Sequence, residues 1–220
     1  MLKVVVFDGG YGGELFADQL EEELPVLEVI RVIDWRNAEQ ILASPRKARR
    51  VAVDALRPYI GNVDLIIIAN NLITVTSLKY LRRKYRNQKF LGLSLKTPDT
   101  YVKRDVVILA TKAITKTISY QNYIFRLKRR AKTVVLDEWP NQIDDGELTE
   151  AEIHKTLSPY ITRINPNREE VVLACTQFND IIPELRRLFG KNLKIHDSFS
   201  DAIRNTCHTL QIRGGTGKKK

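Results

Sequence analysis

Two polar segments of the chain follow apolar runs and contain residues that can bind a carboxylate or move a proton. One is Asn70-Asn71, which follows Leu-Ile-Ile-Ile-Ala at 65–69, and the other is Cys175-Thr176-Gln177, which follows Val-Val-Leu-Ala at 171–174. Amides and hydroxyls donate hydrogen bonds to anionic ligands, and a thiol can also donate or accept a proton. Aligned by their apolar runs, the segments put Asn70 at the position of Cys175, which predicts two similar halves.

The apolar runs before these segments predict buried strands of parallel sheets. They show no alternation of apolar and polar residues, which is typical of strands covered on both faces. Ligands of such sheets bind at the carboxyl ends of the strands. We therefore expect both polar segments to line a ligand site.

A third polar segment lies near the start of the chain. Val-Val-Val-Phe at 4–7 predicts a strand, residues from Asp8 to Gly13 form a glycine-rich loop, and helical spacing follows from Glu14 to Glu23. The glycines let a ligand approach the backbone, and the helix N-terminus offers amides to a carboxylate or phosphate. A purely structural turn fits this loop as well as a ligand-binding one does.

The remaining polar candidates lie between residues 105 and 150. Thr111 and Thr117 follow the apolar run 105–109 at the head of a predicted helix, where hydroxyls serve as anion ligands or as caps. Asp144 lies in a predicted acidic loop, 137–146, between a strand and a helix.

The order of strands and helices predicts an α/β fold of two pseudo-symmetric, Rossmann-like lobes with mostly parallel sheets and an active-site cleft between them. We expect residues 1–92 with 194–213 to form the first lobe and 93–193 the second. The basic tail, 214–220, is expected to be disordered. The predicted strands are 3–7, 27–33, 63–68, 90–95, 105–109, 132–136, 171–177 and 193–195.

Composition excludes several classes of protein. The 220 residues are 43% hydrophobic and 28% charged, as in an ordinary globular chain, and no apolar run is long enough for a membrane anchor or signal peptide. The two cysteines, Cys175 and Cys207, are too few for a disulfide framework, and no CxxC pair suggests zinc. We expect a cytoplasmic protein with no metal and no membrane contact.

Taken together, these segments resemble the motifs of the cofactor-independent aspartate/glutamate racemase superfamily, and of glutamate racemase in particular. The family's opening D-S-G-x-G-G is similar to the loop from Asp8 to Gly13. Its C-N-T motif falls on Asn70-Asn71-Leu72, and its G-C-T-H motif on Ala174-Cys175-Thr176-Gln177. Two weaker matches are the T-x-x-T-x-x-S-x-x-Y segment, on Thr111, Ile114, Thr117 and Tyr120, and the acidic E-x-G turn, on Asp144-Asp145-Gly146.

The resemblance implies a site that needs no cofactor and binds a small amino acid or carboxylate. In glutamate racemase two cysteines flank the substrate Cα, one removing a proton and the other delivering one to the opposite face. The resemblance also implies a homodimer. The residues that it implies for the site are Cys175, Asp8 and Asp144 as catalytic groups and Gly9, Asn70, Asn71, Thr111, Thr117, Thr176 and Gln177 as substrate-binding groups.

The sequence departs from this pattern at the first cysteine. Asn70 stands in its place, and an amide is no proton-transfer base near neutral pH; Leu72 and Gln177 replace a threonine and a histidine of the motifs. We therefore expect one-cysteine acid/base chemistry at Cα, of a decarboxylase, lyase or isomerase type, and not two-base glutamate racemization. Cys175 would then be the acid/base, as in the arylmalonate decarboxylase branch.

Three alternatives remain open. The chain is a catalytically inactive homologue that binds a small anionic ligand, or it racemizes with a replacement base such as Lys112. The third alternative, nucleic-acid binding, follows from the formal charge of +10 and the basic run from Arg126 to Lys132. We do not expect nucleic-acid binding, since the sequence contains no aromatic stacking platform or known binding motif.

Overall fold

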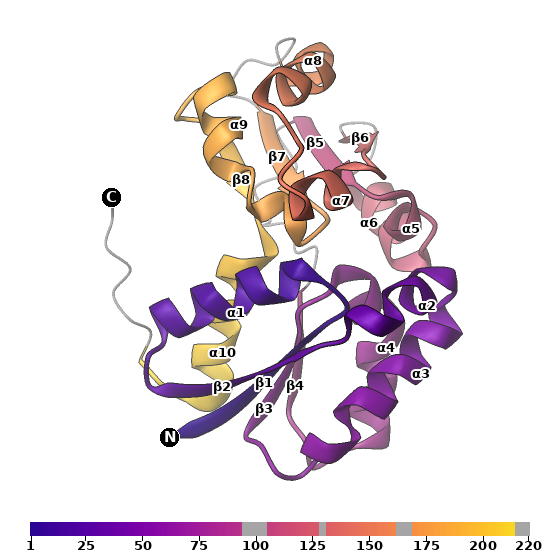
Figure 1. Ribbon diagram of the computed structural model, residues 1–220, viewed down its shortest axis with the longest axis vertical. Helices are drawn as coiled ribbons and strands as arrows, with labels where there is room; N and C mark the ends of the chain where they lie inside the picture. The colour runs from indigo at the N-terminus through magenta and orange to yellow at the C-terminus, as the bar shows by residue number, and fades with distance from the viewer. Residues whose placement is uncertain (94–104, 128–130, 162–168, 214–220) are drawn as a thin grey trace. The chain divides into compact units, whose positions relative to one another are not determined.

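The chain folds into two compact units, which the computed structural model describes at residues 1–93, 105–127, 131–161 and 169–213. The first unit is Met1–Ser94 with Ser198–Lys220, and the second is Leu95–Asp197. Each holds one four-stranded parallel sheet flanked by helices (Figure 1), which confirms the predicted α/β class. The predicted disordered tail, 214–220, lies outside the described residues.

The first unit is a sheet covered by helices on both faces. Its elements in chain order are β1 (Leu2–Asp8), α1 (Tyr11–Glu23), β2 (Leu27–Ile33), α2 (Ala38–Ala43), α3 (Pro45–Leu56), β3 (Leu65–Ile68), α4 (Asn71–Lys84), β4 (Phe90–Gly92) and α10 (Ser198–Leu210). The strand order is β2-β1-β3-β4.

Alternate residues of the central strand β1 pack against different helices. Val4 and Val6 share an apolar cluster with α1 and α10, while Val5 and Phe7 share one with α3 and α4. Both clusters are closed to water, which explains the unbroken run of apolar residues in β1. The first unit therefore has α1 and α10 on one face of its sheet and α3 and α4 on the other.

The second unit repeats this plan with other helices. Its elements in chain order are β5 (Asp105–Ala110), α5 (Lys112–Thr115), α6 (Ile118–Leu127), β6 (Ala131–Val135), α7 (Trp139–Asp144), α8 (Glu150–Ile161), β7 (Glu169–Leu173), the 3₁₀ turn η5 (Gln177–Asn179), α9 (Ile182–Phe189) and β8 (Lys194–His196). The strand order is β6-β5-β7-β8.

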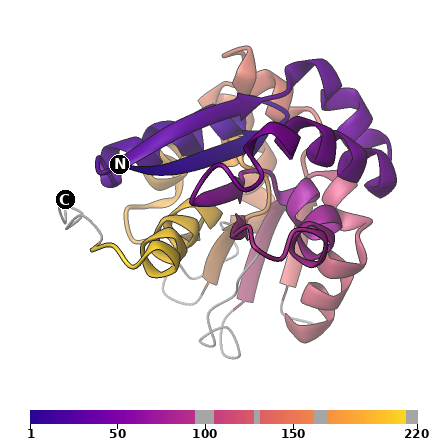
Figure 2. The same cartoon turned by 90° about the horizontal axis from the view of Figure 1, so that it is seen from below.

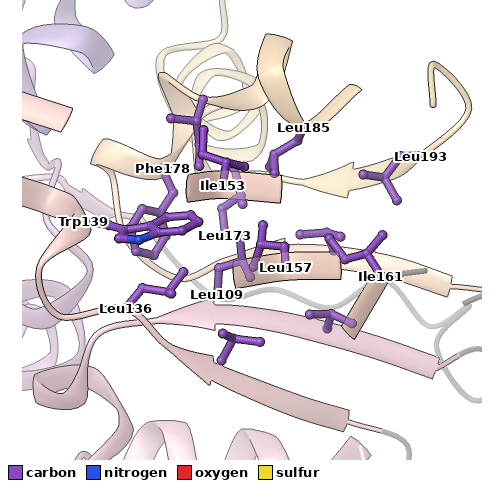
Figure 3. Packing of buried hydrophobic residues seen from close by; sticks show 14 of the residues in the cluster. Leu109, Leu136, Trp139, Ile153, Leu157, Ile161, Leu173, Phe178, Leu185 and Leu193 are labelled. Carbon is purple, nitrogen blue, oxygen red and sulfur yellow. The ribbon is translucent and has the colours of Figure 1, made fainter. Parts of the chain in front are cut away.

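One large apolar cluster joins α7, α8 and α9 to the second sheet. Leu109 and Leu173 of the two central strands pack with Ile153 and Leu157 of α8 (Figure 3). Trp139 of α7 meets the ring of Phe178 in η5 edge to face, with 6.2 Å between the ring centroids. This contact holds the start of α7 against the turn that follows β7.

The two sheets have the same strand order and the same register. In the first unit Ile68 of β3 is registered with Phe7 of β1, and in the second Leu173 of β7 is registered with Leu109 of β5. Ala69, which follows Ile68, donates its amide to the carbonyl of Phe7 at 2.8 Å. Ala174, which follows Leu173, donates its amide to the carbonyl of Leu109 at the same distance. β1, β2, β3 and β4 therefore correspond to β5, β6, β7 and β8.

Two segments predicted as loops contain helices. The predicted acidic loop 137–146 contains α7, because Pro140 fits the first turn of a helix and two acidic residues precede it, where the helix dipole favours negative charge. The connection before Ser44 contains α2. Ser44 caps α3, its Oγ accepting from the amide of Lys47 at 3.3 Å.

Two predicted strand assignments also change. The strand predicted at 171–177 ends at Leu173, since residues 174–177 turn away into η5. Residues 194–196 were assigned to the first lobe, but β8 pairs with β7, with Val172 registered on His196. This strand therefore belongs to the second sheet.

None of the helices described here is both long enough and apolar enough to cross a membrane.

Candidate functional site

Asp8 is the buried acidic residue at the carboxyl end of β1. Only 1% of its surface is exposed. Its Oδ1 accepts a hydrogen bond from the backbone amide of Gly9 at 2.5 Å and another from Nδ2 of Asn70 at 2.7 Å. The Asn70 amide thus binds the carboxylate directly.

Two glycines allow the close packing around Asp8. A Cβ atom on Gly13 would lie 2.3 Å from Cβ of Asp8, and one on Gly9 would lie 2.5 Å from Cδ1 of Ile41. The first of these distances leaves no room for any side chain on Gly13. Gly13 therefore sets the distance between α1 and the end of β1.

Asn70 is the N-cap of α4. Its Oδ1 accepts from the backbone amide of Ile73 at 2.9 Å, and its Nδ2 donates to Asp8. Asparagine is among the preferred N-cap residues because its short side chain reaches the amides of the first turn. Both polar atoms of Asn70 thus have a structural partner within the first unit.

Asn71 is buried next to Asn70 in the chain and differs from Asp8 and Asn70 in its hydrogen bonding. It is 4% exposed, and neither its Oδ1 nor its Nδ2 has a hydrogen-bond partner among the described residues. A buried amide without partners costs free energy, so such groups in folded proteins generally meet a ligand or water. Asn71 is therefore the best candidate in the first unit for a ligand contact.

In the second unit the candidate residues gather around the Gln177 side chain. Its Oε1 accepts from Sγ of Cys175 at 3.0 Å and from Oγ1 of Thr176 at 3.1 Å. The thiol is partly exposed, whereas Thr176 is buried. Because an amide oxygen cannot take up a proton near neutral pH, it acts on Cys175 only as a hydrogen-bond acceptor.

Asp144 at the end of α7 reaches the same side chain. The pKa of its carboxyl group is raised to about 6, mainly by partial burial. A hydrogen bond with Gln177 lowers this pKa, whereas the nearby charges of Asp145 and Asp180 raise it. The residue as a whole is exposed, so solvent screens these charges. The contact joins Asp144, Gln177 and Cys175 in one chain of polar groups.

The two candidate threonines that follow β5, Thr111 and Thr117, differ in their hydrogen bonds. Thr117 donates its hydroxyl to the carbonyl of Ile114 at 2.8 Å and accepts from the amide of Tyr120 at 3.2 Å, so it caps α6. Thr111 precedes α5, and its side chain makes no cap hydrogen bond. Of the two hydroxyls, that of Thr111 is the more available to a ligand.

Two residues near the polar group around Gln177 in the second unit were not predicted. Asn179 donates its Nδ2 to the carbonyl of Thr176 at 2.8 Å, and Asp180 raises the pKa of Asp144. Both belong to the 3₁₀ turn η5 and the residue that ends it. Their polar character directly after Gln177 is the signal that could have marked them.

Asn70 and Cys175 occupy equivalent positions of the two units. Each is the second residue after the last residue of the corresponding central strand, Ile68 or Leu173. The same register puts Asn71 at the position of Thr176. The structure thus supports the alignment of the two polar segments made from sequence.

No group of three or more histidine, cysteine or acidic side chains in the described ranges is arranged to hold a metal ion.

The chain is similar in sequence and structure to amino-acid racemases. A glutamate racemase of Roseiflexus sp. (strain RS-1) is 25% identical over 217 residues, which cover 95% of this chain and 79% of that protein. The solved structure of Escherichia coli glutamate racemase with L-glutamate and the activator UDP-MurNAc-ala matches with a TM-score of 0.81 at 21% identity, covering 99% of this chain and 86% of that one. The chain thus resembles members of the aspartate/glutamate racemase superfamily in sequence over nearly its whole length and shares the fold of their solved structures.

Other superfamily members extend the comparison. The structure of Picrophilus torridus aspartate racemase matches with a TM-score of 0.59 at 16% identity and covers 97% of this chain and 95% of that one. No family model matches the chain. The similarity to these proteins therefore extends over the whole length of the chain, and it agrees with the motif resemblance around Asp8, Asn70 and Cys175.

Proposed function

We propose that the chain is an enzyme of this superfamily that moves a proton at Cα of a small amino acid or carboxylate, with Cys175 as its only thiol acid/base. The observation that carries the proposal is the difference between two equivalent positions. At one position the Cys175 thiol donates a hydrogen bond to an amide oxygen. At the other, the Asn70 side chain is hydrogen-bonded to Asp8 and to the backbone of the first turn of α4. Proton transfer then runs from one face of the substrate.

The hydrogen bond to Gln177 makes Cys175 a proton donor in its resting state. A carbanion at Cα, left by loss of carbon dioxide, takes the proton of the thiol, and the resulting thiolate regains a proton from solvent. With an amino acid, the thiolate form of Cys175 takes the Cα proton, the thiol exchanges it with solvent, and the thiol then returns a proton to the same face of the carbanion. Gln177 cannot store the proton, so it acts by holding the S–H bond in position. Thr176 donates to the same oxygen and fixes the Gln177 side chain.

The remaining polar groups are suited to binding. Asn71 and Thr111 are the donors whose side chains the fold leaves available; Thr111 directly follows β5, and Asn71 begins α4, three residues after the end of β3. Carboxylates such as Asp8 and Asp144 attract the ammonium group of an amino acid. The similarity to glutamate and aspartate racemases favours amino acids over malonates as substrates.

The test is exchange of the Cα proton in heavy water, followed by NMR and by chiral chromatography. The substrates are both enantiomers of glutamate and aspartate, together with substituted malonates. Exchange or deuteration with one stereochemical outcome supports the proposal. Exchange with inversion would contradict the assignment of Asn70, because a second proton-transfer group would then be present.

The two cysteines provide a matched pair of variants. Cys175→Ser should abolish the exchange, whereas Cys207→Ser should leave it unchanged, because Cys207 lies in α10 against the apolar cluster of the first unit. Equal losses in both variants would contradict a special role for Cys175.

A second candidate is a protein of this fold that only binds an anionic ligand. The observation that favours it is the Asn70–Asp8 pair, in which two of the implied site residues already satisfy each other. Calorimetric binding of an amino acid or dicarboxylate with no exchange in heavy water would support this alternative. A cytoplasmic location and a homodimer also remain predictions.

A further inference from the structure

The first unit separates its charges onto the two faces of its sheet. Helix α1 carries five acidic residues and no basic residue. On the other face α3 carries four basic residues and one acidic residue, and α4 carries four basic residues and no acidic residue. A basic composition alone would spread these charges evenly, so the separation needs its own explanation.

The basic residues of α3 and α4 form one continuous surface. The helices lie side by side (Figures 1 and 2). Arg49 of α3 donates to the carbonyl of Thr76 in α4 at 3.1 Å, and its guanidinium lies 4.8 Å from the centre of the Tyr80 ring. Lys84 lies 5.7 Å from the same ring. We call the exposed basic residues of both helices the α3–α4 face; they are Arg46, Lys47, Arg50, Lys79, Arg82, Arg83 and Lys84.

Little within the unit neutralises this surface. The acidic residue of α3, Asp54, pairs with Arg50 and Arg57, and no acidic side chain of the described residues pairs with Arg46 or Arg83. Positive charge in the first turn of α3 also opposes the helix dipole, which favours anions there. A bound polyanion would relieve both unfavourable interactions.

We propose that the α3–α4 face binds the phosphate backbone of double-stranded nucleic acid. The partner is a duplex, because binding of single strands relies on aromatic rings that stack with bases. Here Tyr80 is the one exposed ring in the described part of α3 and α4, with the cationic groups of Arg49 and Lys84 at 4.8 and 5.7 Å from its centre, and Tyr85 packs beside Lys84 and Phe90. A single exposed ring does not provide the row of stacking rings that a single strand needs. Contacts are therefore to phosphates and independent of base sequence.

Two other partners fit the surface less well. A membrane-binding helix needs a large apolar face beside its basic residues, and in the described part of α3 and α4 only Tyr80 is an exposed large apolar side chain, at 37%. A second copy of the chain would bring its acidic α1 to this face, but Arg31 already pairs with Glu14, Asp18 and Glu21 there. The expectation from sequence, which disfavoured nucleic acid, lacked the positions of these charges.

The test is fluorescence anisotropy of a labelled DNA duplex titrated with the full chain over a range of salt concentrations. The double variant Arg46→Gln/Arg83→Gln removes two exposed cations that pair with no acidic side chain in the described part of the chain. Removing a phosphate contact lowers the salt slope by about 1 and the affinity by about eightfold near 0.1 M salt. The matched control is Lys116→Gln/Lys155→Gln, which removes two exposed cations from the second unit.

The inference is supported if the first variant weakens duplex binding and flattens the salt slope while the control does neither. Equal effects of the two variants would overturn it, since net charge alone would then explain the binding. No salt-dependent binding of the duplex would also overturn it. So would tight binding to vesicles of anionic lipid, or salt-sensitive self-association in sedimentation, without duplex binding. Thermal melts of both variants, expected to match the wild type, verify the fold.

Discussion

Replacing Asn70 tests the arrangement at the end of β3 most directly. Asn70→Ala removes the N-cap of α4, which is worth about 0.5–2 kcal/mol. It also removes the hydrogen bond to the buried Asp8 carboxylate, and hydrogen bonds to charged groups contribute about 1.5–3 kcal/mol. Because Asn70 is itself only partly buried, we expect the lower half of the combined range, a loss of about 2–3 kcal/mol in the free energy of unfolding.

Two further variants separate these contributions. Asn70→Ser keeps a good N-cap and should lose only the Asp8 bond, about 1.5 kcal/mol. Asn70→Asp also keeps the cap but puts a second carboxylate against Asp8. Its loss should be large at neutral pH and should shrink as acid protonates one of the pair.

The assay is urea unfolding by circular dichroism, combined with hydrogen exchange read by mass spectrometry. Exchange should rise in β1, β3 and α4 and stay unchanged in β5 and β7, which serve as the internal reference. The reasoning is refuted if Asn70→Ala changes the free energy of unfolding by less than about 0.5 kcal/mol, or if Ala and Ser cost the same.

Three further substitutions probe the surroundings of the site. Gly13→Ala should destabilise the first unit by about 1–3 kcal/mol, seen as a lower urea midpoint, because its Cβ would overlap that of Asp8. The folded-state pKa of Asp144, about 6, lies above its ordinary value of 3.8, so the protonated carboxyl group favours the folded state. Its contribution to the free energy of unfolding is fully present below about pH 4 and is lost as pH rises through 6. Wild type should therefore lose stability relative to Asp144→Asn over that interval, and parallel stability curves would contradict the shift. Gln177→His supplies a group that can accept the thiol proton and should speed alkylation of Cys175 at neutral pH, whereas Gln177→Leu should not.

The fold was predictable because its central strands contain short, unbroken apolar runs. Runs such as residues 4–7 and 65–68 are buried on both faces, so their patterns show no alternation, and this is typical of parallel sheets. The segments that were misread are polar and short. Helix α7 has only six residues, and its apolar anchors, Trp139 and Ile143, pack in a cluster that includes residues distant in sequence, such as Leu173, Phe178 and Leu185.

The positions of the candidate residues were predictable from sequence, but their hydrogen-bond partners were not. Sequence placed Asp8, Asn70 and Cys175 at the carboxyl ends of strands, since parallel strands deliver residues to one edge. It did not predict that Asn70 binds Asp8, because the two lie 62 residues apart and the contact depends on the register of β1 with β3. The bond from Cys175 to Gln177 depends likewise on the 3₁₀ turn that begins at Gln177.

Helix α10 affects the order in which the two units can fold while the chain is being synthesised. Phe199, Ala202 and Ile203 of this helix complete the apolar cluster of the first unit, and Phe199 meets the ring of Phe16 in α1 edge to face at 5.1 Å. The second unit lies between α4 and α10 in the chain, so a nascent chain on the ribosome carries both sheets before the first core is closed. The second unit, continuous in sequence, is able to finish folding first, and a chain that stops before α10 leaves apolar surface on the first unit uncovered.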